Sequence, residues 1–305
     1  MKIIFLGTPS FVVPVLENLA KKHEILAVFC QPDKPGNRNK ITVSPVKEFA
    51  QNNNILVFTP NKIDDEVIEQ AKSLCPDVMV CCAYGRILPQ KFIDICPILN
   101  VHPSDLPKYR GSSPVQWALI NGEREIVVTV MKMCFKMDAG EMLLKQPLPV
   151  LDEDNSETIL KKSFILGSEM LDKVLENFEF YLKNVQVQNE EYATVCPMLK
   201  KEDGKINFEK PAKSIENLVR GLYMWPVAYC TLNGKNFKIF KAKAQDDTMQ
   251  GIKTGQVIAC DKSGVKIACG EGVLTLLEVQ IEGAKRMMAR DFVNGNQIKV
   301  GDILC

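Results

Sequence analysis

An asparagine, a histidine and an aspartate occur where a small catalytic group could form. Asn100 and His102 are two residues apart at the end of an apolar run, so in a strand both side chains would point to the same face. Asp138 follows a later apolar run that could return to the same edge. An amide that stabilises an oxyanion, an imidazole that moves a proton and a carboxylate that orients the imidazole suffice for acyl transfer to an amine.

The same residue types also fit structural roles. An asparagine at a strand end is commonly a cap or turn residue, and an aspartate after a strand is commonly a loop residue. His102 could equally be a partly buried structural histidine, and His23 lies in a polar stretch where it is expected to be solvated. Residue type and spacing therefore leave catalytic and structural roles both open.

Dinucleotide and metal chemistry are disfavoured. The segment from Leu6 to Pro9 follows the first apolar run but lacks the second glycine of G-x-G-x-x-G, which a pyrophosphate needs for close backbone approach. The 11 cysteines contain no C-x-x-C pair and there are only 2 histidines, so we expect no metal site. An odd number of cysteines, most of them in apolar runs, indicates buried free thiols in a reducing compartment.

The surrounding elements predict an α/β fold. Apolar runs alternate with helical patterns, which is typical of a mostly parallel, Rossmann-like sheet covered on both faces. In such sheets ligands bind at the carboxyl ends of the strands, where Asn100 and His102 lie. The expected strands span residues 2–6, 25–30, 78–82, 98–102, 126–133 and 142–150, and the expected helices span residues 9–22, 46–53, 66–74, 90–95, 114–121 and 154–178.

The last hundred residues predict a second, β-rich domain. Short apolar runs separated by turn signals at 233–234, 262–264 and 270–272 indicate a small β-barrel of the OB-like kind. We expect a catalytic domain over residues 1–183, a linker over 184–205 and the barrel over 206–305.

Charge is divided unevenly between these parts. Residues 206–305 hold 14 Lys and Arg against 10 Asp and Glu, a net charge of +4, whereas the whole chain has a net charge of +1. Four lysines of the barrel stand in a stretch without acidic residues, namely Lys235, Lys238, Lys241 and Lys243. This stretch is either an ordinary solvated face or a weak electrostatic footprint for a phosphate backbone.

Membrane and secretory classes are excluded by the apolar pattern. The longest apolar run, from Val78 to Tyr84, is far shorter than the roughly 20 residues that a membrane-spanning helix requires. The first residues lead directly into a strand pattern without the long apolar core and cleavage site of a signal peptide. We expect a cytoplasmic protein with no membrane association.

The segment NVHPSDLPKYRG from Asn100 to Gly111, together with Asp138-Ala139-Gly140, resembles the signature of folate-dependent formyltransferases. The resemblance covers essentially the whole chain and is strongest to the branch that acts on initiator methionyl-tRNA. That part of the resemblance rests on FLGTP at 5–9, on the loop from Gln31 to Lys47 and on AYGRILP at 83–89.

The resemblance implies transfer of the formyl group of 10-formyltetrahydrofolate to the α-amine of initiator methionyl-tRNA. We expect the protein to act as a monomer and without a metal. The resemblance also implies a catalytic set of Asn100, His102 and Asp138 and a folate site lined by Ser104, Asp105, Leu106 and Pro107. It implies that the loop residues Lys34, Arg38 and Lys40 reach the acceptor end of the tRNA, and we expect Lys235, Lys238, Lys241 and Lys243 to add phosphate contacts. This chain departs from the family at Asp105, where leucine is usual, and at Pro103, where glycine is frequent.

Two other functions fit parts of the pattern. A sugar-nucleotide N-formyltransferase would use the same chemistry on an amino sugar, and the segments at 31–47 and 84–89 favour the tRNA enzyme over it. A non-catalytic RNA-binding protein could keep the fold, but it would not need Asn100, His102 and Asp138 together.

Overall fold

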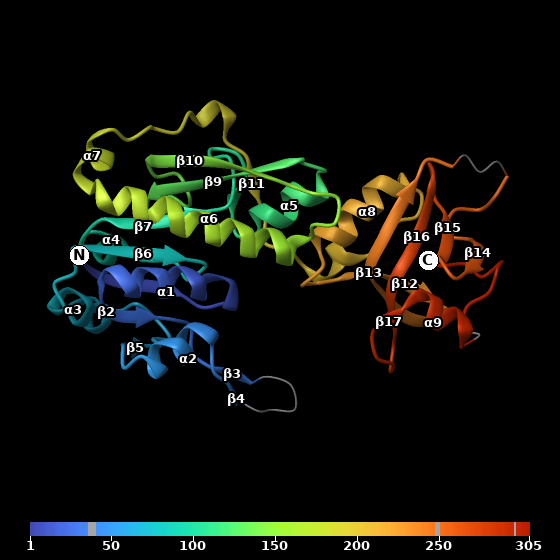
Figure 1. Cartoon of the computed structure of the whole chain (residues 1–305), viewed down its shortest axis with the longest axis horizontal. Coiled ribbons are helices and arrows are strands. Elements are labelled where there is room, and N and C mark those ends of the chain that lie inside the picture. The colour runs from blue at the N-terminus through green and yellow to red at the C-terminus, as the bar shows by residue number, and fades with distance from the viewer. Residues whose placement is uncertain (36–40, 248–250, 296) are drawn as a thin grey trace. The chain divides into compact units, whose positions relative to one another are not determined.

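The computed structural model describes residues 1–35, 41–247, 251–295 and 297–305. The chain divides into two units (Figure 1). The first consists of Met1–Pro114, Glu125–Pro149 and Leu160–Cys196, and the second consists of Val115–Arg124, Val150–Ile159 and Pro197–Cys305. The predicted limits of the linker, 184 and 205, remain a prediction.

A mostly parallel sheet organises the first unit. Its described strands follow the order β10-β9-β7-β6-β1-β2-β5, in which neighbours from β7 to β5 are parallel and β9 and β10 are antiparallel. The central strands are buried along almost their whole length because helices cover both of their faces, and they are mostly apolar, with Asn100 and His102 of β7 as the polar exceptions at a carboxyl end. The strands are β1 (Lys2–Gly7), β2 (Glu24–Phe29), β5 (Leu56–Phe58), β6 (Val78–Cys82), β7 (Ile98–His102), β9 (Glu125–Lys132) and β10 (Met142–Pro149).

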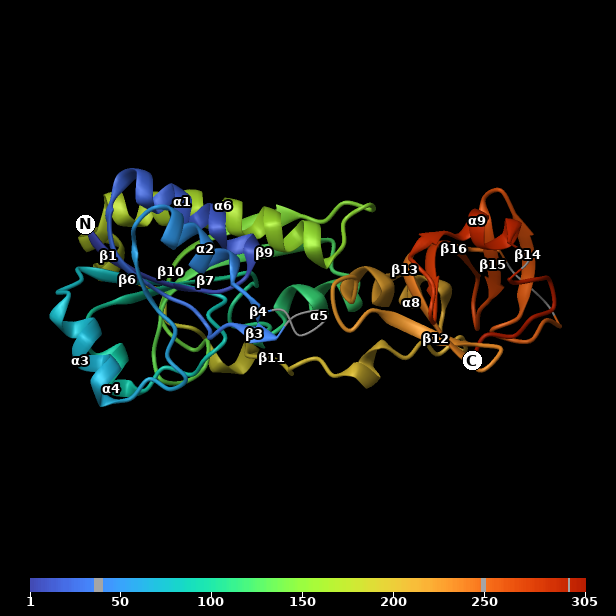
Figure 2. The same cartoon turned by 90° about the horizontal axis from the view of Figure 1, so that it is seen from below.

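Helices lie on both faces of this sheet (Figure 2). On one face, α3 (Asp65–Ser73) and α4 (Gln90–Ile93) pack against buried strand residues that include Phe29 and Met79. On the other face, α1 (Val13–Lys22) packs beside α6 (Ser156–Glu176), and the ring of Phe164 stacks on that of Phe11 with centroids 5.3 Å apart. The predicted Rossmann-like α/β architecture is confirmed.

Several short elements were missed by the sequence analysis. The sequence pattern predicts one helix over 154–178, but the structure has α6 followed by α7 (Phe178–Lys183), because Asn177 leaves the helical conformation at φ −125° and ψ 43°. In the first unit, strand β5 and four two-residue strands were also missed, since two or three residues carry no periodicity. These two-residue strands are β3 (Lys34–Pro35), β4 (Ile41–Thr42), β8 (Arg110–Gly111) and β11 (Val195–Cys196).

The second unit contains α5 (Pro114–Ile120) from Val115 onward, α8 (Ala212–Gly221), α9 (Ala289–Asn294) and an antiparallel sheet. At the predicted turn, Asn233 and Gly234 have φ of 51° and 76°, as a tight type I′ hairpin requires. The chain end bridges the two edges of the sheet, because Cys305 pairs with Thr231 on β12 and the amide of Leu304 donates to the carbonyl of Gly255 before β14. The described strands are β12 (Ala228–Leu232), β13 (Lys235–Gln245), β14 (Val257–Asp261), β15 (Gly264–Ala268), β16 (Val273–Ile281) and β17 (Met287–Met288).

Within the described residues, no helix combines the length and the apolar character that crossing a bilayer would require.

Candidate active site

Asn100 and His102 lie at the carboxyl end of β7, on the same face of the strand and almost fully buried, at 8% and 5% exposure. The strand is held on both sides, since Asn100 is opposite Cys81 of β6 and Met131 of β9. Among the described residues, the Asn100 amide has no hydrogen-bond partner. The amide is therefore available to hydrogen-bond a bound ligand.

The imidazole of His102 lies between a carbonyl and a carboxylate. Its Nε2 is 3.0 Å from the carbonyl oxygen of Tyr109, which can only accept, so Nε2 carries a proton. Its Nδ1 is 3.8 Å from Oδ1 of Asp138, a residue 36 positions later in the chain. The structure thus brings together the histidine and the aspartate that the sequence analysis singled out.

The carboxylate of Asp138 is held from two directions. Its Oδ2 accepts a hydrogen bond of 2.9 Å from the backbone amide of Gly111, which leaves Oδ1 facing His102. Asp138 itself has φ of 48°, in the left-handed region that non-glycine residues seldom adopt. Residues held in that region are common at functional sites, where the surrounding structure keeps them in place.

The four residues expected to bind folate form a tight loop after β7. Ser104 donates from its hydroxyl to the carbonyl of Lys108 at 2.8 Å, and Leu106 is fully buried against Met131 and Met142, so neither side chain faces outward. Asp105 is half exposed and pairs with Lys145, and Pro107 follows a cis peptide bond.

Lys145 also donates to the carbonyl of Leu106 at 2.9 Å. It therefore anchors the loop at Asp105 and Leu106.

The basic residues expected to contact tRNA belong to two separate regions. Lys34 lies in β3, of which only the backbone is described, and Arg38 and Lys40 lie outside the described residues. The other four lie within β13 in the second unit, where Lys235, Lys241 and Lys243 are exposed and Lys238 is half-buried.

Three residues close to the site were missed by the sequence analysis as functional candidates. Arg110 is buried and donates to Gln188 and to Glu190, and Gln188 donates to the carbonyl oxygens of Asp138 and Gly140. The alternation of Val185-Gln186-Val187-Gln188 is typical of an extended edge segment and could have indicated such a role. Hydrogen bonds from Arg110 and then from Lys136 lower the pKa of Glu190 to about 2.

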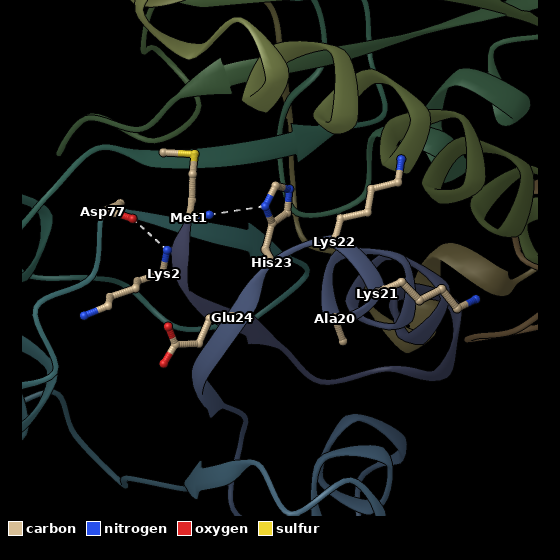
Figure 3. A pocket seen from close by; sticks show the side chains of 8 residues that line it. All are labelled: Met1, Lys2, Ala20, Lys21, Lys22, His23, Glu24 and Asp77. Atoms are coloured by element: carbon tan, nitrogen blue, oxygen red, sulfur yellow. Dashed lines mark hydrogen bonds between the residues drawn. The ribbon is translucent and has the colours of Figure 1, made fainter.

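A polar hollow lies at the opposite edge of the sheet (Figure 3). It is lined by residues at the amino-terminal ends of β1 and β2, including Lys2, His23 and Glu24. Burial, and then the positive chain terminus 3.5 Å away, lower the pKa of His23. The described residues contain no group of three or more His, Cys, Asp or Glu side chains placed to hold a metal ion.

The comparisons with known proteins agree with this geometry. Residues 1–175 match the formyl transferase family and residues 198–297 match the formyl transferase C-terminal domain. The methionyl-tRNA formyltransferase of Acetivibrio thermocellus is 40% identical over 309 residues, which cover 100% of this chain and 99% of the relative. The chain belongs to the methionyl-tRNA formyltransferase family. The match extends over both parts of the chain, so it includes the site at β7 and the basic strand β13.

Solved structures share the fold at lower sequence identity. The methionyl-tRNA formyltransferase from Clostridium thermocellum aligns with a TM-score of 0.57 at 21% identity, covering 88% of this chain and 100% of that one. An N-formyltransferase from Helicobacter canadensis, solved with folinic acid and dTDP-3-aminofucose, aligns with a TM-score of 0.68 at 19% identity. That alignment covers 90% of this chain and 99% of the other.

Proposed function

We propose that this chain transfers a formyl group from 10-formyltetrahydrofolate to the α-amine of initiator methionyl-tRNA in the cytoplasm. The observation that carries the proposal is the convergence of Asn100, His102 and Asp138 at the carboxyl edge of a Rossmann-like sheet. The full-length similarity to methionyl-tRNA formyltransferases supports the tRNA as the acceptor.

The residues at this edge fit a folate. The Asn100 side chain is 8% exposed and its amide has no hydrogen-bond partner among the described residues, and Nε of Arg86 is fully buried and unpaired there. Ile87, between β6 and β7, is 79% exposed and offers an apolar surface to a flat heterocycle. Because Ser104 and Leu106 point inward, we infer that the loop 104–107 contacts the folate through its backbone. When bound, the folate supplies the activated formyl group.

Asn100 and His102 would stabilise the negative charge that develops on the formyl oxygen. The Asn100 amide is an N–H donor from the start, whereas His102, whose Nε2–H faces the Tyr109 carbonyl, donates from Nδ1 once that atom has taken up a proton. The burial of both side chains strengthens electrostatic interactions with the reacting group. The donors are fixed by the strand before the substrate arrives, so little reorganisation is needed.

Asp138 and Nδ1 of His102 would take the proton of the attacking amine and pass it to the folate nitrogen, whose bond to the formyl carbon breaks after the new C–N bond to the amine has formed. Two atoms 3.8 Å apart can both lie within about 2.8 Å of a third atom, which is normal hydrogen-bond distance. The amine, or a water next to it, can therefore contact both groups at once. Since the pKa of a free α-amino group is about 8, only a modest driving force is needed to deprotonate it.

The acceptor would be held mainly through its phosphates. Lys241 is exposed and has no carboxylate within ion-pair distance among the described residues, so its charge is available. Lys243 is 3.9 Å from both Asp152 and Glu216 and is therefore partly neutralised. We place Lys34, Arg38 and Lys40 at the acceptor end and the β13 lysines on the backbone of the tRNA.

The test is formyl transfer by the purified chain to charged initiator tRNA. Removing an oxyanion donor with Asn100→Ala should lower kcat about 10²–10³-fold, and removing the imidazole with His102→Ala should lower it about 10²–10⁴-fold. His23→Ala is the matched control, because it removes the other histidine of the chain at the opposite edge of the sheet. Near-normal kcat in folded Asn100→Ala or His102→Ala would refute the assignment.

A second acceptor in the same assay separates the tRNA enzyme from its relatives. With a dTDP-linked amino sugar replacing the tRNA, we expect no formylated product. Efficient formylation of the sugar and none of the tRNA would assign the chain to sugar-nucleotide modification instead.

A further inference from the structure

Gln188 is the most completely hydrogen-bonded side chain beside the candidate site. It lies between α7 and the 3₁₀ turn at Glu190–Tyr192, and it is 5% exposed. Its Nε2 donates to the carbonyl oxygens of Asp138 at 2.9 Å and Gly140 at 2.8 Å. Its Oε1 accepts from Nε and Nη2 of Arg110 at 3.0 and 2.9 Å. Both donors and both acceptor positions of the amide are therefore in use.

Arg110 fixes the orientation of that amide. The guanidinium is buried, and two of its three remaining N–H groups donate to the two carboxylate oxygens of Glu190 at 2.8 and 3.1 Å. Lys136 lies 2.7 Å from the same carboxylate. These cations lower the pKa of Glu190 to about 2, and the carboxylate is charged at neutral pH, so the buried Arg110 is paired there.

The turn that Gln188 holds is the one that presents Asp138. A left-handed conformation is uncommon for a residue with a side chain, although aspartate adopts it more often than most, so contacts from outside the turn help to hold it. Gln188 donates to the carbonyl at each end of Asp138-Ala139-Gly140, on the backbone, while the carboxylate of Asp138 faces Gly111 and His102. Gln188 can therefore set the position of the Asp138 carboxylate without contacting the carboxylate itself.

We propose that Gln188, oriented by Arg110 and Glu190, is a positioning residue for formyl transfer that fixes the Asp138 carboxylate against His102. This inference rests on the proposed function, because it assigns Asp138 a part in the reaction. It also assigns a functional task to the polar segment after α7, which connects to β8 through the β11 pairing of Val195 with Arg110.

The decisive variant is Gln188→Glu. It keeps the size of the side chain and an oxygen that accepts from Arg110, but it replaces the donor nitrogen by an oxygen that faces two carbonyl oxygens. The matched control is Asn189→Asp, the same amide-to-acid change one residue later, at an exposed position where the side-chain oxygen still accepts from the amide of Glu191. Wild type and Asn189→Asp should have equal kcat.

We expect Gln188→Glu to lower kcat about 10–100-fold, because displacement of a catalytic group by about 1 Å costs up to roughly 10²-fold, while the KM for the tRNA changes less than threefold. In an Asp138→Asn background the same change should lower kcat less than threefold, since the carboxylate through which it acts is gone. An equal loss in both backgrounds, or a kcat within threefold of wild type in the single variant, would overturn the proposal.

A second variant keeps the proposal testable even when Gln188→Glu fails to fold. Glu190→Gln alters an exposed carboxylate that restrains Arg110, and it should lower kcat about threefold to tenfold in the Asp138 background and not in the Asp138→Asn background. If Gln188→Glu does not fold, the comparison of Glu190→Gln in the two backgrounds tests the proposal in its place. Absence of formyl transfer in wild type and Asn189→Asp alike would instead count against the proposed function itself.

Discussion

Replacing Gly111 by alanine should damage stability and activity together. Gly111 has φ of 122°, beyond the left-handed region that other residues occasionally adopt, and its amide donates to Asp138. A Cβ there would overlap the carbonyl oxygen of Cys196, the residue that pairs with it across β8 and β11. The oxygen is backbone, so relief requires the two strands to separate.

The expected loss in the free energy of unfolding is the sum of the backbone strain and the lost strand contact. A disfavoured backbone conformation costs on the order of 1–3 kcal/mol, and loss of the strand contact brings the total to about 3 kcal/mol, the upper end for a single change. For a unit of this size, a loss of about 3 kcal/mol lowers Tm by roughly 6–12 °C. Moving the Gly111 amide should also release the Asp138 carboxylate and lower kcat at least about tenfold.

Gly234→Ala is the control. Gly234 also has positive φ, at 76°, but an added Cβ would meet no atom within 4 Å. It should lower Tm of the second unit by only about 2–4 °C, from about 1 kcal/mol of backbone strain, with kcat unchanged. The measurements are calorimetric unfolding and formyl transfer for both variants. Equal Tm shifts, or full activity in Gly111→Ala, would refute the reasoning.

Three further outcomes can be measured independently. The carboxyl of Glu190 titrates at about 2 when folded and about 4.5 when unfolded, so its contribution to stability is complete above pH 4.5 and is lost as the pH falls toward 2. In acid unfolding, Glu190→Gln should therefore lose less stability than the wild type as the pH falls from about 4.5 to about 2. Lys241→Ala should reduce the slope of log affinity for tRNA against log salt by about 0.7–0.9, and Lys243→Ala should reduce it less, because two carboxylates lie 3.9 Å from that lysine. Iodoacetamide at pH 8 should label exposed Cys75 in the native protein and spare Cys81, because burial raises the pKa of the Cys81 thiol to about 12.

Local sequence was sufficient for the elements that are buried and continuous. Both β6 and β7 have the limits that were predicted, β6 because a strand covered on two faces is an unbroken apolar run, and β7 because Pro103 directly follows its last residue. The type I′ turn at Asn233-Gly234 was predictable for a similar reason, since few other residue pairs accept two positive φ values. The placement of Asn100 and His102 at a sheet edge followed from the same strand pattern.

Tertiary structure alone decided how the site is assembled. The 3.8 Å approach of Asp138 to His102, the carbonyl of Tyr109 on Nε2 and the amide of Gln188 beneath the Asp138 turn join segments that no local pattern connects. The same holds for Lys145, which reaches the loop at Asp105 from the antiparallel strand β10.

These contacts depend on strand register and on loops that return from distant parts of the chain. Sequence periodicity reports which face of an element is buried, but it carries no information about which distant side chain meets that face. The residue types of the site were therefore visible in the sequence, whereas the hydrogen bonds that hold them required the fold.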